Sequence, residues 1–81
     1  MNMLRVLSKR GDDCVAWDIK KAAVGDEEAK SAVREAERIF AEQRARGATA
    51  YRVETGKAPT RIDQFDPAAE QIVMVPRVVG G

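Results

Sequence analysis

One long amphipathic segment, residues 26–47, constrains the fold of this chain more than any other feature of its sequence. Apolar side chains recur there at helical spacing, and Glu, Lys and Arg occupy most of the opposite side. Asp26 is well placed to cap the first turn and Gly47 to end the last one, which predicts a helix of about 20 residues. Because such a helix has one apolar face, it must bury that face against a second layer.

Short segments on both sides of this helix have the composition of strands. Residues 3–9 and 14–17 flank the turn sequence Arg-Gly-Asp-Asp, so residues 3–17 are expected to form a hairpin. Residues 49–53 and 71–75 are typical of two further strands, the second of them a short apolar run suited to burial. Residues 19–25 remain open between a connection and an early helical turn.

The stretch between those last two strands has an irregular pattern. Residues 54–57 favour a tight turn, and Pro59 argues against another helix. We expect a short irregular strand at residues 61–65 and a capped helical turn at residues 66–70, where Pro67 suits the first helical position. Pro76 stops the last strand.

This order of elements predicts a two-layer α+β domain, in which a mixed sheet of about four strands packs on one long helix. The 81 residues leave room for one compact domain. We expect it to span residues 1–76 and to be followed by a flexible C-terminal tail at residues 77–81. A ferredoxin-like arrangement is less suitable because only one long helix is visible in the pattern.

Charge and residue content argue against several function classes. The 14 Lys and Arg are interspersed with 13 Asp and Glu, and the net charge of +1 predicts no binding to nucleic acid or to an anionic membrane. His is absent and Cys14 is the single cysteine, so neither a zinc site nor an internal disulfide is expected. The N-terminal apolar run is too short for a signal peptide, and no segment approaches the roughly 18 apolar residues of a membrane span. These features predict a cytoplasmic protein that binds no metal.

The sequence closes with Gly80 and Gly81, which follow Pro76-Arg77-Val78-Val79. With Gly at about 7% of residues, two glycines arise at these positions by chance in roughly one chain in 200. Residues without side chains can pass through the narrow channel by which an activating enzyme draws a terminal carboxylate to ATP. A frayed terminus is the alternative explanation.

In its order of elements and in the ending IVMVPRVVGG, the sequence resembles the ubiquitin-like β-grasp proteins, and especially the small sulfur carriers of molybdopterin and thiazole synthesis. The resemblance implies a β-grasp fold, in which the first and last strands lie side by side and parallel at the centre of the sheet. It also implies that the chain is the substrate of an E1-like activating enzyme and is not itself an enzyme.

The resemblance further implies a role for each residue of the tail. An E1-like partner would use ATP to adenylate the carboxylate of Gly81, and the product would be captured as a thioester or thiocarboxylate, or joined to a lysine of a target protein. Gly80 would supply clearance, while Arg77, Val78 and Val79 would contact the partner. No cofactor would be bound by this chain itself.

A noncovalent protein-interaction module is the alternative function, and under it the Gly-Gly ending is incidental. Such a module would use a sheet face or the exposed side of the helix. A small enzyme is the least favoured class, because no His, no paired nucleophile and base, and no cofactor motif occur. Met3, Leu7 and Val73 are surplus apolar positions for an outer sheet face, which leaves both a monomer and a weak dimer open.

Other residues are expected to have structural roles. Cys14 is predicted to be a small packed residue. Trp17 is expected to pack in the core, and this role is favoured over that of an anchor for a partner. Turn formation and capping account for the acidic residues outside the helix more simply than metal binding or acid–base chemistry does. These acidic residues are Asp12, Asp13, Asp63, Asp66 and Glu70.

Overall fold

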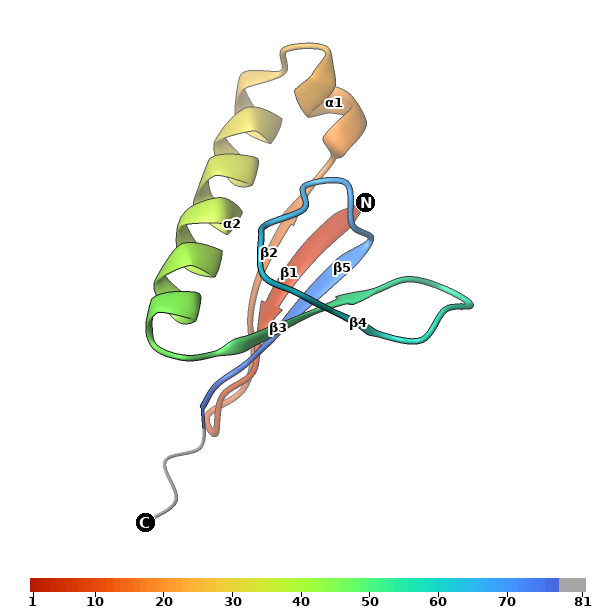
Figure 1. Ribbon diagram of the computed structural model, residues 1–81. Coiled ribbons are helices and arrows are strands. Elements are labelled where there is room, and N and C mark those ends of the chain that lie inside the picture. Colours follow the sequence, from red (N-terminus) through yellow and green to blue (C-terminus); the bar gives the residue numbers. More distant parts are fainter. Residues whose placement is uncertain (78–81) are drawn as a thin grey trace.

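The computed structural model describes residues 1–77, which form a five-stranded mixed sheet with one long helix across one face (Figure 1). The strands are β1 (Asn2–Val6), β2 (Asp13–Trp17), β3 (Thr49–Val53), β4 (Thr60–Ile62) and β5 (Gln71–Val75). The helices are α1 (Ile19–Ala23) and α2 (Glu27–Ala45). The predicted α+β class is confirmed.

The first and last strands lie side by side within the sheet, whose order is β2-β1-β5-β3-β4. β1 runs parallel to β5, with Leu4 opposite Ile72 and Val6 opposite Met74. The other three neighbouring pairs are antiparallel. The expectation of a parallel pair formed by the chain's first and last strands is therefore confirmed.

The predicted long helix and hairpin both form. The side-chain Oδ1 of Asp26 accepts a hydrogen bond of 2.9 Å from the amide of Ala29, and so caps the first turn of α2. At the other end, Gly47 has a φ of +92°, which a residue with a side chain rarely adopts. β1 and β2 pair in an antiparallel hairpin as expected, and the hydroxyl of Ser8 bonds the carbonyl oxygen of Gly11 in its turn.

The segment between the hairpin and α2 contains one short helix. α1 begins after Asp18, whose Oδ1 accepts hydrogen bonds from the amides of Lys20 (3.0 Å) and Lys21 (3.3 Å). α1 contains no buried residue, and Gly25 follows it with a φ of +91°. The structure thus resolves the open choice at residues 19–25 in favour of a capped helical turn.

The predicted count of about four strands is too low, because Thr60–Ile62 pairs with β3 as a fifth strand. Residues 63–65 do not continue that strand, so the irregular segment expected at residues 61–65 begins one residue earlier and is shorter. Residues 66–70 form a turn and no helix. The amide of Ala68 bonds the side chain of Asp66 at 3.0 Å, and the amide of Ala69 bonds its carbonyl oxygen at 3.2 Å.

The core lies between α2 and the facing side of the sheet. Along β1 and β5 alternate residues are buried, as a two-residue strand period requires. Three alanines, Ala36, Ala48 and Ala50, are at most 1% exposed and allow the helix and sheet to approach closely. The other buried apolar residues are Leu4, Val6, Trp17, Ala29, Phe40, Ala69, Ile72 and Met74.

Trp17 is the largest of these core residues and is 1% exposed. Its ring centre lies 5.7 Å from that of Phe65, which in turn lies 5.8 Å from that of Phe40 in an edge-on contact. The three aromatic side chains connect β2, the crossover before β5 and α2. The expected core role of Trp17 is therefore confirmed.

One buried polar side chain ties both ends of the domain together. Asn2, 7% exposed, donates from Nδ2 to the carbonyl oxygen of Ala69 at 2.7 Å. Its Oδ1 accepts from the amide of Ile19 at 3.2 Å. Both of its polar atoms are therefore satisfied, so its burial carries no penalty for an unpaired group.

Candidate functional site

Four of the five tail residues predicted to form the site, Val78, Val79, Gly80 and Gly81, lie outside the described residues. The fifth, Arg77, is the last described residue and is exposed. It follows Pro76, which ends β5 because proline has no amide hydrogen for the sheet ladder. The described part of the candidate site is therefore its base, where the chain leaves the sheet.

Arg77 lies against the end of α2 at Gly47. A Cβ atom placed on Gly47 would lie 3.1 Å from Cδ of Arg77 and 3.6 Å from its Cβ. The arginine stem therefore covers the glycine surface, while the residue remains exposed. Figure 1 shows that α2 and β5 end on the same side of the molecule. The helix end thus positions the base of the tail.

The sheet face that turns away from α2 carries a partly apolar surface. Met3, Tyr51 and Val73 are half-buried there, where Val73 pairs with Arg5 on one side and with Tyr51 on the other. The guanidinium Nε of Arg5 lies 3.8 Å from the carboxylate of Asp12. The structure places Met3 and Val73 on this outer face as expected, and Leu7 follows directly after β1, half-buried.

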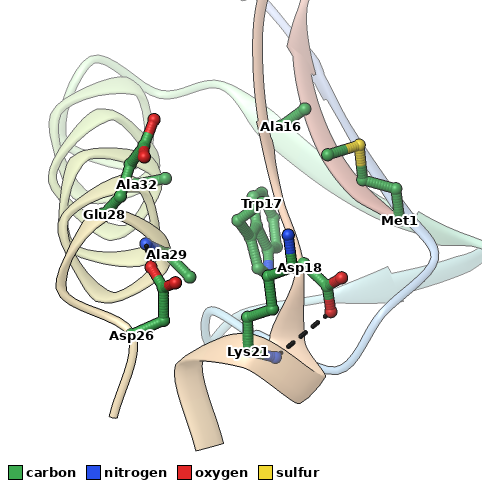
Figure 2. Close-up of a pocket in the computed structure, with 9 residues that line it drawn as sticks. All are labelled: Met1, Ala16, Trp17, Asp18, Lys21, Asp26, Glu28, Ala29 and Ala32. Carbon is green, nitrogen blue, oxygen red and sulfur yellow. Dashed lines mark hydrogen bonds between the residues drawn. The ribbon is translucent and has the colours of Figure 1, made fainter. Parts of the chain in front are cut away.

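A hollow of about 220 Å³ lies between β2 and the first half of α2 (Figure 2). In Figure 2, Ala29 and Ala32 of α2 lie across from Trp17 of β2, and Asp18 and Lys21 lie at one end. The residues that line the hollow are Met1, Ala16, Trp17, Asp18, Lys21, Asp26, Glu28, Ala29 and Ala32. We refer to this surface as the acidic hollow.

The charged side chains of the acidic hollow are three carboxylates and one ammonium group. Asp18 and Asp26 each use a carboxylate oxygen to cap a helix, so their positions are fixed by backbone amides. Glu28 is exposed and takes part in no ion pair among residues 1–77. Against these three, only Lys21 contributes a positive side chain. The hollow therefore favours cationic groups.

β2 lines part of the acidic hollow. Among the described strands β2 pairs with β1 alone, so its other side is an open edge of the sheet next to the hollow. The amide of Met3 bonds the carbonyl oxygen of Glu70, directly before β5, at 3.0 Å, and the amide of Leu7, directly after β1, bonds that of Met74 in β5 at 3.1 Å. The even-numbered residues of β1 therefore bond β2. By the same alternation, the backbone groups of Cys14 and Ala16 point to the open side. Such an edge can accept a further strand.

Cys14 is exposed, and the prediction that it is packed is wrong. It lies opposite Arg5 in the β1–β2 pair, on the face of the sheet that turns away from α2. Because side chains alternate between faces along a strand, the burial of Val15 and Trp17 toward the helix side directs Cys14 outward.

Three of the acidic residues outside the helix, Asp63, Asp66 and Glu70, have structural partners. Asp66 caps its own turn and lies 3.3 Å from Nη1 of Arg52. Glu70 accepts hydrogen bonds from the amide (3.1 Å) and the hydroxyl (3.0 Å) of Thr55. Asp63 pairs with Arg44 at 3.2 Å. These contacts hold the crossover between β3 and β5 in place.

Within residues 1–77, no group of three or more Cys, Asp or Glu side chains is arranged to hold a metal ion. None of the helices described is long and apolar enough to cross a membrane. Comparisons with protein-family models, with curated proteins and with solved structures found no match.

Proposed function

We propose that this chain is a ubiquitin-like β-grasp protein whose Gly81 carboxylate is activated by an E1-like partner, either as a protein modifier or as a sulfur carrier. The observation that carries the proposal is the parallel pairing of β1 with β5 inside a sheet of order β2-β1-β5-β3-β4, with α2 across one face. This arrangement supports a β-grasp fold, and the sequence that follows β5 ends in Gly-Gly.

The position of β5 suits this role. It is hydrogen-bonded to β1 on one side and to β3 on the other, so it is held more firmly than an edge strand. Pro76 and Arg77 then lead directly from it toward the two glycines. A partner enzyme that draws the terminal carboxylate into its own site would pull against this anchored strand, and Gly80 would let the backbone approach closely.

The proposed chemistry has two steps, followed by a third where a target protein is modified, and the partner supplies the catalytic groups. A carboxylate oxygen of Gly81 attacks the α-phosphorus of ATP, and pyrophosphate leaves. A cysteine thiolate of the partner then displaces AMP to form a thioester, or a hydrosulfide donor displaces AMP to form a thiocarboxylate. Attack on the thioester by the amine of a target lysine would release the thiolate and form an isopeptide bond. Contacts from Arg77, Val78 and Val79 would orient the tail.

Intact-mass analysis of the protein recovered from its own host cells tests this proposal. We expect either the mass change of one oxygen replaced by sulfur at the C-terminal carboxylate, or a population joined to other polypeptides through Gly81. A variant that lacks Gly80 and Gly81 should show neither. Peptide mapping that finds Gly81 inside a longer mature chain, or a free carboxylate with no adduct under all growth conditions, would refute the proposal.

The acidic hollow favours a second candidate, a noncovalent interaction module. The two outward-facing backbone positions of β2 could pair with an extended peptide that also enters the adjoining hollow. The carboxylates of the hollow would select a peptide with basic side chains. Under this candidate, loss of Gly80 and Gly81 leaves partner binding intact.

The fluorescence of Trp17, the single tryptophan, reports on this second candidate, because Trp17 lines the hollow. An extended peptide of alternating Arg and Val should change its emission and bind less tightly to the Glu28→Lys variant. Glu37→Lys is the matched control, since Glu37 is exposed on α2 and does not line the hollow. Equal binding by both variants would exclude the hollow as the binding site.

A further inference from the structure

A second concave surface lies between α1 and α2 and differs from the acidic hollow in both polarity and charge. It is a recess of about 330 Å³. Ile19, Ala22 and Ala23 line it from α1, Val33 lines it from α2, and Pro67 lines it from the crossover before β5. We refer to this surface as the basic recess, for the charges described next.

All charged side chains that line the recess are cationic. They are Lys30 and Arg34 of α2, which follow one another by one helical turn. Lys30 pairs with Glu27 at 3.3 Å, but the two side chains are 43% and 80% exposed, and such pairs contribute little to stability. Arg34 is exposed and forms no ion pair within residues 1–77. Both cations are therefore available to a ligand.

A further apolar side chain, that of Val24, is exposed close to the recess along the chain. This valine is 84% exposed and directly follows the last residue of α1, Ala23. Because α1 has no buried residue, its apolar side chains are only partly covered by α2 and the crossover. Covering them would contribute free energy in proportion to the apolar area removed from water.

We infer that the basic recess binds an acidic amphipathic segment of a partner protein. An apolar side chain of that segment fills the recess over Ala22 and Val33, a second one covers Val24, and its carboxylates lie beside Lys30 and Arg34. The acidic hollow lies on the other side of the first turns of α2 and repels the same segment. The two surfaces therefore fix where an acidic ligand binds.

The shape of the recess favours a peptide over an anionic membrane. Membrane-binding surfaces insert protruding apolar side chains between lipids, whereas this apolar surface is concave and has one protruding residue, Val24. The inference does not rest on activation of Gly81, so a chain that lacks Gly80 and Gly81 should bind the segment unchanged.

Chemical-shift mapping on the isotope-labelled full chain tests the inference with a synthetic amphipathic peptide, in which Leu recurs at helical spacing and Glu fills the other positions. We expect its addition to shift the amide signals of Ala22, Ala23, Val33 and Arg34 before any others. The same peptide with Lys in place of Glu should bind at least about tenfold more weakly, which corresponds to roughly 1.4 kcal/mol.

Two variants with the same change in net charge sharpen this test. Arg34→Glu should weaken binding of the Glu peptide by roughly tenfold or more, because it places a like charge beside the ligand. Arg10→Glu, in the exposed β1–β2 turn, should leave binding unchanged. Equal effects of the two variants, or shifts confined to the outer sheet face, would overturn the inference. So would binding to phosphatidylserine vesicles with no binding of the peptide up to about 1 mM.

Discussion

The indole Nε1 of Trp17 donates a hydrogen bond of 2.9 Å to the carbonyl oxygen of Pro67, 50 residues later in the chain. Trp17 lines the acidic hollow, and Pro67 lines the basic recess. One bond thus connects the two concave surfaces and joins β2 to the crossover before β5. We expect the shape of both surfaces to depend on it.

Replacement of Trp17 by Phe should lower the free energy of unfolding by about 1–3 kcal/mol, because a partly buried carbonyl loses its donor and a smaller ring leaves space. Urea denaturation followed by circular dichroism measures this change. Tyr51→Phe, which removes one polar atom from the outer sheet face, serves as the control and should change stability by less than about 0.5 kcal/mol. A similarly small loss in Trp17→Phe would show that the bond to Pro67 contributes nothing.

Asn2→Asp should make stability depend on pH in a way that Asn2→Ala does not. The introduced carboxyl would be buried beside the carbonyl oxygen of Ala69, so its pKa in the folded state should rise above the unfolded value of about 4. Its protonated form can still donate a hydrogen bond. The stability deficit relative to the natural chain should therefore be smallest below that unfolded pKa and should grow as the pH rises through the folded pKa.

Denaturation of both Asn2 variants between acidic and neutral pH checks this expectation. Near neutral pH the stability deficit of Asn2→Asp should reach about 3 kcal/mol. The carboxylate is then buried in its charged form, and it has no hydrogen to donate to the carbonyl oxygen of Ala69. The Asn2→Ala deficit should stay nearly constant with pH. Parallel pH profiles for the two variants would contradict the buried position of this side chain.

Most secondary structure could be predicted from local patterns. The apolar period and the caps Asp26 and Gly47 fix α2, because capping and amphipathicity are local properties. Thr49–Val53 and Gln71–Val75 agree with the predicted strands residue for residue. The pattern missed β4 as a full partner of β3, because a three-residue edge strand is defined by its pairing and only weakly by its composition.

The surfaces were harder to predict than the elements. The exposure of Cys14 depends on which face of β2 meets α2, and a short strand with apolar residues on both faces does not specify this. Both concave surfaces combine residues from α1 and α2 with others from distant segments, such as Pro67. The opposite charges of the two surfaces follow from the spacing of residues along α2. Glu28 and Lys30 are two positions apart, so they point to different sides of the helix and line different surfaces.

Removal of Arg38 should return the pKa of Glu35 to its ordinary range. Arg38 donates hydrogen bonds to Glu35 and Glu42 one turn away on either side. The hydrogen bond from Arg38 lowers the pKa of Glu35, and this bond raises the pKa of Arg38. Because the folded pKa of Glu35 is depressed, the pair stabilises the fold above the unfolded pKa, and this contribution is lost as the pH falls through the folded one.

Carboxyl-detected NMR titration of Arg38→Gln measures the effect directly. The pKa of Glu35 should rise in this variant and should remain lowered in Arg34→Gln, where the pair is intact. Added salt should reduce the difference, since these side chains are solvent-exposed. An unchanged pKa in Arg38→Gln would show that the pair does not persist in solution.

Gly47 should tolerate a side chain less well than Gly25, although the two have nearly the same backbone conformation, with φ of +92° and +91°. Gly25→Ala should cost about 1 kcal/mol through backbone strain alone, because within residues 1–77 no heavy atom beyond the two chain neighbours lies within 4 Å of the added Cβ. Gly47→Ala adds a contact of 3.1 Å with Cδ of Arg77, which should increase the loss by up to about 1 kcal/mol.

A double-mutant cycle separates strain from contact at this position. In an Arg77→Ala background, Gly47→Ala should cost no more than Gly25→Ala, because the side chain that it meets is gone. Additive losses, with no coupling between Gly47 and Arg77, would show that the arginine does not rest on the helix end in solution. Coupling would establish that the end of α2 positions the first residue of the tail, which is the part of the chain that the proposed activating partner would bind.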